Sequence, residues 1–197
     1  MKMADGSTRD VFYNGFTLDE FGDGHGLRQL GIEHAKPFIT RGILIDIAGA
    51  KGVDVLAAGY EVRTTDVRAA LARQGVDESS LKPGDGIFFR YGTSKLWKQP
   101  AGGGRAPAGI GMEVARWVVD RQPSMVGSDA GGLEVASGPD IAFPVHQELL
   151  TKNGIYNLEN MTFDDLVADG VNEFLFIFTP IRFVGATGSP GRPIAIR

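Results

Sequence analysis

The sequence contains no cysteine, which excludes thiolate zinc sites, cysteine nucleophiles and disulfide scaffolds. It also lacks a long hydrophobic run, because no stretch approaches the ~18 apolar residues that span a bilayer. The polar segment 1–14 shows no signal-peptide pattern. With 20 basic and 24 acidic residues, the net charge of −4 gives no field to hold a polyanion. These absences predict a cytoplasmic protein with no membrane and no nucleic-acid partner.

Two further absences narrow the chemistry. No Gly-x-Ser-x-Gly motif occurs, so the sequence offers no serine-hydrolase nucleophile. Only three histidines are present. His25 lies in a glycine-rich loop, and His34 lies among charges nine residues later, with no helical pattern between the two. We therefore expect both to be surface imidazoles and not a pair of metal ligands.

The composition that remains is that of an ordinary globular protein, with 197 residues, 43% hydrophobic and 22% charged. A chain of this size buries roughly 70% of its extended surface on folding, so its core needs no metal to hold it together. No internal repeat or linker is visible. We expect one domain over residues 1–197, with residues 1–40 forming an irregular arm.

Strand-like and helix-like segments alternate along the chain, which predicts a layered α/β architecture. Predicted strands cover residues 42–47, 86–91, 125–129 and 173–178. The last of these is apolar on both faces from Phe174 onward, which predicts that both faces are covered. Predicted helices cover residues 64–74, 112–120 and 144–153, and another begins at Thr162. Thr65 is the expected cap of the first helix, and Asp165 completes a capping box for the last.

His146 is the histidine of most interest. On the predicted helix it shares a face with Leu149 and Leu150, and that face should point inward. Such a histidine is either a core side chain bonded to a backbone carbonyl or a metal ligand or catalytic base. Glu159 follows the extended segment 155–158, beyond a tight turn at Gly154, and could share a zinc or manganese ion with it. Glu159 could equally be a solvated carboxylate near the next helix.

Three other places could contact a ligand. Arg90 ends the predicted strand 86–91, and Asp129 lies where another strand meets glycines. Because ligand crevices lie at the carboxyl ends of strands in α/β sheets, we predict both as substrate-binding residues. Asp129 could instead be a turn aspartate bonded to its own backbone. Segment 185–192 offers amides, hydroxyls and a cation for an anion, although a structural turn explains it as well.

Collinear short motifs resemble those of the putative cyclase family, which includes kynurenine formamidase-like enzymes, isatin hydrolases and a dienelactone hydrolase. The resemblance covers roughly residues 12–197, and the motifs are Gly-Ile-Phe-Phe-Arg-Tyr-Gly at 86–92, Gly-Ile-Gly at 109–111, Gly-Ser-Asp at 127–129, Phe-Pro-Val-His at 143–146, Gly-Ile at 154–155, Glu-Asn at 159–160, Phe-Leu-Phe at 174–176 and Gly-Ala-Thr-Gly-Ser-Pro at 185–190.

This resemblance implies a swivelling β/β/α fold, a homo-oligomer and a divalent-metal hydrolase, with manganese or zinc as the metal. The implied substrate is a small formamide, amide, cyclic amide or lactone, whose carbonyl is attacked by metal-activated water. His146 and Glu159 match the late histidine and glutamate of the metal site in formamidase-like members. The aromatic segment 12–16 is expected to pack on another subunit.

The chain departs from the family at one important point. The signature His-x-Gly-Thr-His-x-Asp-x-Pro-x-His, which supplies most metal ligands and the catalytic histidine, is absent. We therefore expect an N-terminally truncated family domain that has little or no activity by itself, and no catalytic residue can be assigned. The alternative is a non-catalytic remnant of the family that binds a small ligand or only oligomerises.

Overall fold

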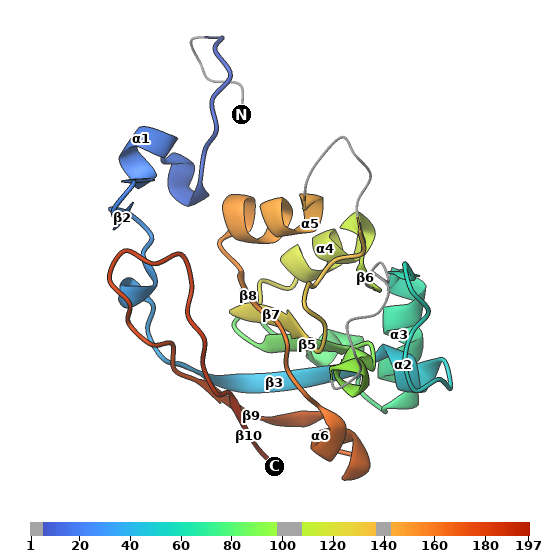
Figure 1. The fold of residues 1–197 in the computed structure, drawn as a ribbon. Coiled ribbons are helices and arrows are strands. Elements are labelled where there is room, and N and C mark those ends of the chain that lie inside the picture. The colour runs from blue at the N-terminus through green and yellow to red at the C-terminus, as the bar shows by residue number, and fades with distance from the viewer. Residues whose placement is uncertain (1–5, 98–107, 137–142) are drawn as a thin grey trace.

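A computed structural model describes residues 6–97, 108–136 and 143–197, and it is built around one six-stranded sheet (Figure 1). The strand order is β10-β9-β3-β5-β7-β8. The strands are β3 (Phe38–Asp46), β5 (Gly86–Arg90), β7 (Met125–Ser128), β8 (Tyr156–Leu158), β9 (Glu173–Phe178) and β10 (Ile194–Ile196). Strands β3, β5, β7 and β8 run parallel, whereas β9 is antiparallel to β3 and β10 to β9. The fold is therefore mixed α/β.

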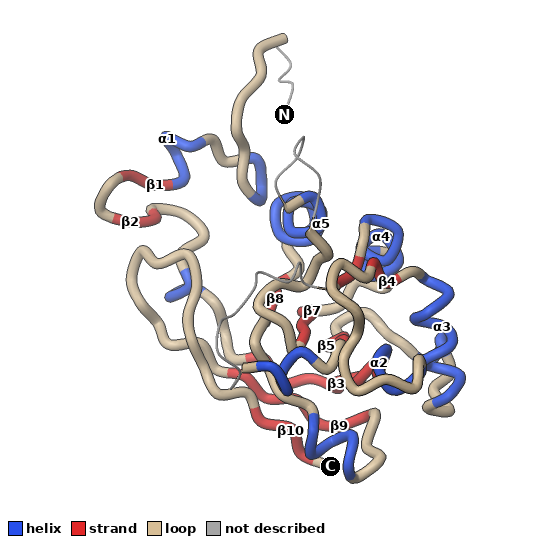
Figure 2. The backbone as a smooth tube through the Cα atoms, turned by 45° about the vertical axis from the view of Figure 1, so that its right-hand side comes forward, coloured by secondary structure: helices blue, strands red, loops and turns tan. Residues whose placement is uncertain are grey.

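Helices cover both sides of this sheet unequally (Figures 1 and 2). The helices are α2 (Ile47–Ala50), α3 (Thr64–Arg73), α4 (Met112–Val119), α5 (Pro144–His146), which continues as the π-helical η5 (Gln147–Lys152), and α6 (Asp164–Ala168). Side chains of α2 to η5 belong to one apolar core, and α6 packs against a second core on the opposite face. The predicted alternation of strands and helices is confirmed.

The period of two along the central strands divides their side chains between the two cores. In β3, Ile43 and Ile45 enter the larger core, whereas Leu44 between them enters the smaller one. In β5, Phe88 does the same, and its ring lies 4.6 Å from that of Phe176. Because β3, β5 and β7 are covered on both faces, they read as continuous apolar runs in the sequence.

The prediction that both faces of 173–178 are covered is wrong. Phe174, Phe176 and Phe178 are buried, but Leu175 is 42% exposed and Glu173 is also exposed. The helices of the larger core pack over the strands from β3 to β8, so the second face of β9 receives no such layer from the described residues. Apolar composition alone therefore overstated the burial of this strand.

Two predicted helix caps differ from the structure. Helix α3 begins at Thr64, as predicted, but its N-cap is Arg63 in place of Thr65, and the carboxylate of Asp66 accepts a hydrogen bond from the backbone N–H of Arg63. Helix α6 begins at Asp164 after Phe163, with no side-chain cap bond. The capping box predicted from Thr162 and Asp165 therefore does not form.

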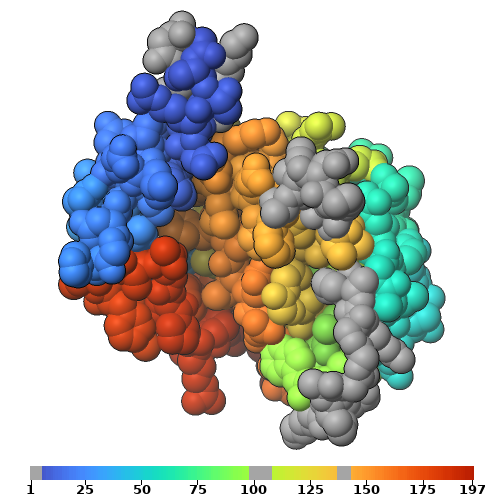
Figure 3. All heavy atoms as spheres, turned by 45° about the horizontal axis from the view of Figure 1, so that its top comes forward, coloured from blue at the N-terminus to red at the C-terminus, as the bar shows by residue number. Residues whose placement is uncertain are grey.

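The remaining described elements are short. They are η1 (Tyr13–Gly15), α1 (Leu18–Phe21), β1 (Gly22–Asp23), β2 (Gly26–Leu27), η2 (Ile32–His34), β4 (Glu61–Val62), η3 (Glu78–Ser80), η4 (Thr93–Leu96) and β6 (Gly109–Ile110). The N-terminal arm lies against the C-terminal segment, and the amide of Leu27 donates to Gly185 O at 2.8 Å (Figure 3). Within the described ranges, no helix combines the length and the apolar character that a bilayer crossing requires.

Candidate metal centre

Charged residues stand at the carboxyl ends of all four parallel strands. Asp46 and Arg90 end β3 and β5, while Asp129 and Glu159 come directly after β7 and β8. Since parallel strands place their carboxyl ends at one edge of the sheet, this edge gathers the candidate residues.

His146 and Glu159 meet at this edge. The Nε2 atom of His146 lies 3.0 Å from Oε1 of Glu159. Glu134 occupies the opposite side of the imidazole, where its carboxylate forms a hydrogen bond with Nδ1 and accepts the backbone N–H of His146 at 2.9 Å. The side chain of Glu134 is almost fully buried, whereas His146 and Glu159 remain about one quarter exposed. The imidazole is thus held by a buried carboxylate and presents Nε2 to a second, accessible one.

A chain of hydrogen bonds fixes the position of Glu159. Its Oε1 accepts the backbone N–H of Leu133 at 3.1 Å, and the carbonyl of Leu133 accepts the hydroxyl of Tyr91 at 3.0 Å. The backbone N–H of Tyr91 in turn donates to Oδ1 of Asp129 at 2.7 Å. Asp129 and Tyr91 are fully buried, so this chain connects the interior of the sheet to the site.

These contacts shift the pKa values of the groups involved. The hydrogen bond to Glu159, and next the one to Glu134, raise the pKa of His146 above its ordinary value, although burial opposes this shift. Burial raises the pKa of the Asp129 carboxyl. Burial also raises the pKa of Tyr91 well above its ordinary value, so its hydroxyl keeps its proton. A proton between His146 and the two carboxylates therefore competes with any cation for the same place.

The chemistry of His146 and Glu159 fits two adjacent ligands of one divalent cation. The separation of 3.0 Å between Nε2 and Oε1 brings both donor atoms within reach of one cation. A histidine ligand usually donates its second ring N–H to a carboxylate, which is the place of Glu134. Because Glu134 lies on the other edge of the ring, it cannot share a cation with Glu159 through the same imidazole. The described part of the chain contains no cluster of three or more His, Cys, Asp or Glu side chains arranged around one ion.

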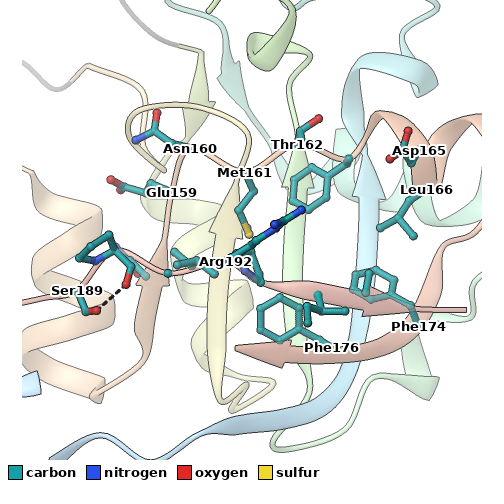
Figure 4. A pocket seen from close by; sticks show the side chains of 18 of the residues that line it. Glu159, Asn160, Met161, Thr162, Asp165, Leu166, Phe174, Phe176, Ser189 and Arg192 are labelled. Atoms are coloured by element: carbon teal, nitrogen blue, oxygen red, sulfur yellow. Dashed lines mark hydrogen bonds between the residues drawn. The ribbon is translucent and has the colours of Figure 1, made fainter. Parts of the chain in front are cut away.

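A cleft of about 1260 Å³ opens beside this pair (Figure 4). His146, Glu159 and Asn157 line it together with apolar side chains from the α6 side of the sheet. Both amide atoms of Asn157 are buried and have no hydrogen-bond partner in the described structure. Arg192 extends across the pocket toward Met161 (Figure 4). The cleft thus combines the unpaired side-chain amide of Asn157, the guanidinium of Arg192 and an apolar floor.

The structure brings together some of the predicted residues but not all. His146 and Glu159 converge, and both His25 and His34 are exposed, as expected. Asp129 is buried and bonded to Tyr91, not to its own turn, and its predicted contact with substrate stays untested. Arg90 lines a different crevice, at the carboxyl ends of β3 and β5. Loop 92–109, whose length and whose Trp97 and Arg105 predict a role in specificity, brings Trp97 to the wall of the cleft, whereas Arg105 lies outside the described residues.

Glu134 was missed by the sequence analysis. It lies in the irregular segment after β7, where no periodicity identifies a face. Its place is fixed by backbone pairing with Ile110, a contact between segments 24 residues apart. The one sequence pattern that could have identified Glu134 is a carboxylate shortly after a glycine-rich strand end, and the sequence analysis took Asp129 to be that carboxylate.

Comparisons with known proteins agree on one family. The family described as putative cyclase matches residues 19–135, more than half of the chain. A crystal structure of a protein described as a novel cyclase is 32% identical, with a TM-score of 0.84, and the match covers 98% of this chain and 66% of that one. No curated protein sequence matches significantly.

More distant solved structures share the fold alone. Isatin hydrolase A from Ralstonia solanacearum is 18% identical, with a TM-score of 0.65 and coverage of 85% of this chain and 64% of that one. A protein from Bacillus stearothermophilus described as a predicted metal-dependent hydrolase is 19% identical, with a TM-score of 0.58 and coverage of 80% and 63%. This chain therefore spans slightly under two thirds of the length of each of these three structures. By its sequence match and its fold, the chain belongs to the putative cyclase family.

Proposed function

We propose that this chain carries part of the metal centre of a hydrolase that acts on a small amide, formamide, cyclic amide or lactone. The observation that carries the proposal is the convergence of His146 Nε2 and Glu159 Oε1 beside a cleft, with Glu134 on the other ring nitrogen. Solved relatives of the same fold include proteins described as isatin hydrolase and metal-dependent hydrolase. Manganese and zinc both suit an imidazole and a carboxylate ligand.

Each of the three residues has a distinct part in this proposal. His146 and Glu159 would hold the cation, and Glu134 would keep the proton of the imidazole on Nδ1, so that Nε2 offers its lone pair. When bound, a divalent cation supplies a nucleophilic water near neutral pH and polarises the carbonyl under attack. The backbone N–H of Leu133 bonds the carboxylate of Glu159, so this carboxylate keeps its orientation whether or not a cation is bound.

The cleft supports a small, partly apolar substrate. Its lining includes Phe174 and Phe176 of β9, which offer apolar surface to the body of a substrate. The unpaired amide of Asn157 is free to bond a polar substrate atom. We expect a substrate with one polar reacting group on an aromatic or aliphatic body, as isatin and aryl formamides have.

A second, non-catalytic function is favoured because the described residues provide an incomplete set of metal ligands. The described residues provide two ligands, whereas a catalytic zinc usually has about three from protein. The chain would then bind a small ligand in the cleft, or oligomerise, without catalysis. For the same reason we expect this chain alone to hydrolyse substrate slowly or not at all, the remaining ligands coming from other groups.

The experiment compares metal binding by the wild type, His146→Ala, Glu159→Ala and a control, His34→Ala. After treatment with a chelator, each is titrated with manganese and zinc, and stoichiometry is measured by calorimetry. Binding near one equivalent that is lost in the first two variants and kept in the control supports the metal centre. Binding that is unchanged in both variants would refute it, and no binding by the wild type favours the second function. Assays with isatin, an aryl formamide and a lactone then test hydrolysis.

The resemblance also leads us to propose a homo-oligomer. In support, aliphatic side chains on β3, β9 and β10 are exposed, namely Ile39, Leu175, Ile194 and Ile196. Light scattering across the micromolar range tests this, and a monomer throughout contradicts it.

A further inference from the structure

A second crevice, of about 600 Å³, opens at the carboxyl ends of β3 and β5. Its walls come from the end of α3, the segment after α2, η4 and the turn between α6 and β9. Among the described residues, it shares no lining residue with the cleft of His146 and Glu159. Binding in this crevice therefore does not depend on a metal ion at His146 and Glu159.

Arg90 is the central observation. Its side chain is only 6% exposed, and its Nη1 donates to Oδ1 of Asp46 at 2.7 Å. Its Nε is buried and has no hydrogen-bond partner among the described residues. A guanidinium has five N–H donors, and a buried donor without a partner destabilises the folded chain. A guanidinium placed at a crevice with an unmet donor is therefore ready to bind an acceptor.

The charges around Arg90 favour an anion. Arg73 and Lys95 also line the crevice, and the only carboxylates among its described lining residues are Asp46 and Asp54. Three cations therefore face two anions, which leaves one positive charge to be balanced. Asp46 is already committed, because it accepts the N–H of Gly49 as well as Arg90. Arg73 is more than half exposed and lies 3.9 Å from Asp46, so its guanidinium has donors to spare.

The walls that are not charged are rigid or apolar. The Gln74 side chain accepts the N–H of Asp46 at 3.0 Å and donates to Leu44 O at 2.8 Å, so this amide is already used in the framework. Val53 and Val167 add hydrocarbon surface from two segments far apart in the sequence. A ligand with one negative charge and a small apolar body matches these walls.

We propose that this crevice binds a small organic carboxylate. Its carboxylate pairs with Arg90, and Arg73 and Lys95 close on it from the exposed side. Its hydrocarbon part lies against Val53 and Val167. An inorganic phosphate carries more charge than the crevice balances and has no apolar part to bury, so it binds less well.

The test measures binding of benzoate to the purified chain by calorimetry, with benzyl alcohol as its neutral counterpart. Lys95→Gln and Arg73→Gln each weaken benzoate binding by about fivefold, since each removes a partly exposed charged donor. Asp54→Asn tightens it, because Asp54 pairs with Lys95 at 2.6 Å and competes with the ligand. Arg68→Gln, an exposed cation of α3 outside the crevice, and His146→Ala leave it unchanged.

Four results would overturn the proposal. The first is the absence of saturable benzoate binding up to about 10 mM, and the second is equal binding of benzyl alcohol. The third is tighter binding of inorganic phosphate in the same measurement, and the fourth is an affinity for benzoate that is the same in Lys95→Gln, Arg73→Gln and the wild type. Arg73 and Lys95 are partly exposed, so the test does not require a substitution of the buried Arg90, which could unfold the chain. Circular dichroism of each variant confirms that the fold is kept.

Discussion

Replacing Glu134 by glutamine tests the hydrogen bonding that orients His146. Glu134 accepts the backbone N–H of His146 at 2.9 Å and bonds the ring at Nδ1, while Val145 N lies 3.5 Å from its other oxygen. A glutamine keeps the shape but offers only one acceptor oxygen, so its NH2 group must face one of these donors. Because the carboxylate is almost fully buried, water cannot relieve that mismatch.

We expect Glu134→Gln to lower the free energy of unfolding by about 2 kcal/mol, the usual cost of one buried polar group left without a partner. For a chain of this length, that corresponds to a fall in Tm of about 4–8 °C. Urea unfolding followed by fluorescence measures it, since the chain has two tryptophans and Trp117 is buried. The matched control is Glu148→Gln on the helix that carries His146, because the pair of Glu148 with the exposed Lys152 should change stability by less than about 0.5 kcal/mol.

Equal stability of Glu134→Gln and Glu148→Gln would refute the hydrogen bonding described for this site. The same variant should also weaken metal binding by about 10- to 100-fold if His146 is a ligand, because the imidazole loses its orienting carboxylate. A loss of stability without any change in metal affinity would leave Glu134 as a purely structural residue.

Three further predictions concern the fold. Phe88→Ala should destabilise the protein by about 3–5 kcal/mol in urea unfolding, because Phe88 is fully buried among the rings of the smaller core; a loss below about 1 kcal/mol would contradict this. Gly127→Ala should cost about 2 kcal/mol or more, since the new Cβ would lie 2.5 Å from the backbone oxygen of Leu158; an unchanged Tm would show that the strands separate easily. Asp66→Asn should cost about 1 kcal/mol at pH 7, because hydrogen bonds from Arg63 N–H, Lys51 and Tyr60 outweigh burial and lower the pKa of Asp66 below its ordinary 3.8. The stabilisation by Asp66 is complete above the pKa of this carboxyl in the unfolded chain and disappears as the pH falls through its lower pKa in the folded chain. The difference in free energy of unfolding between the wild type and Asp66→Asn should therefore vanish in acid.

The elements of the sheet and most helices were predictable because their signals are local. The run around Ile43 and Ile45, and that around Phe88, are strongly apolar, so a strand was predicted at each. However, β3 begins at Phe38, four residues before the predicted start, so residues 38–40 belong to the sheet and not to the irregular arm predicted over residues 1–40. The helix caps were less well predicted. The sequence places both Thr65 and Asp66 at the start of α3, and in the structure the carboxylate of Asp66 bonds the backbone N–H of Arg63, which is the N-cap. Alternative caps differ by about a few tenths of a kcal/mol, which the sequence alone cannot rank.

The burial of β9 and the position of Glu134 were not predictable. Whether Leu175 is covered depends on which strands the helices overlie, and this is a consequence of strand order, not of the composition of β9. Glu134 meets His146 only because its segment pairs with Ile110, and no periodicity records that contact.

The sequence by itself determined the class of fold and the family resemblance, because periodicity and short motifs are properties of neighbouring residues, and it offered the pairing of His146 with Glu159 as one of two alternatives. Only the tertiary structure decided which carboxylate orients the imidazole, that Asp129 supports the site from within, and that Arg90 opens on a separate crevice. These outcomes depend on contacts between segments far apart in the chain, whose geometry is set by the packing of the sheet edge and its loops.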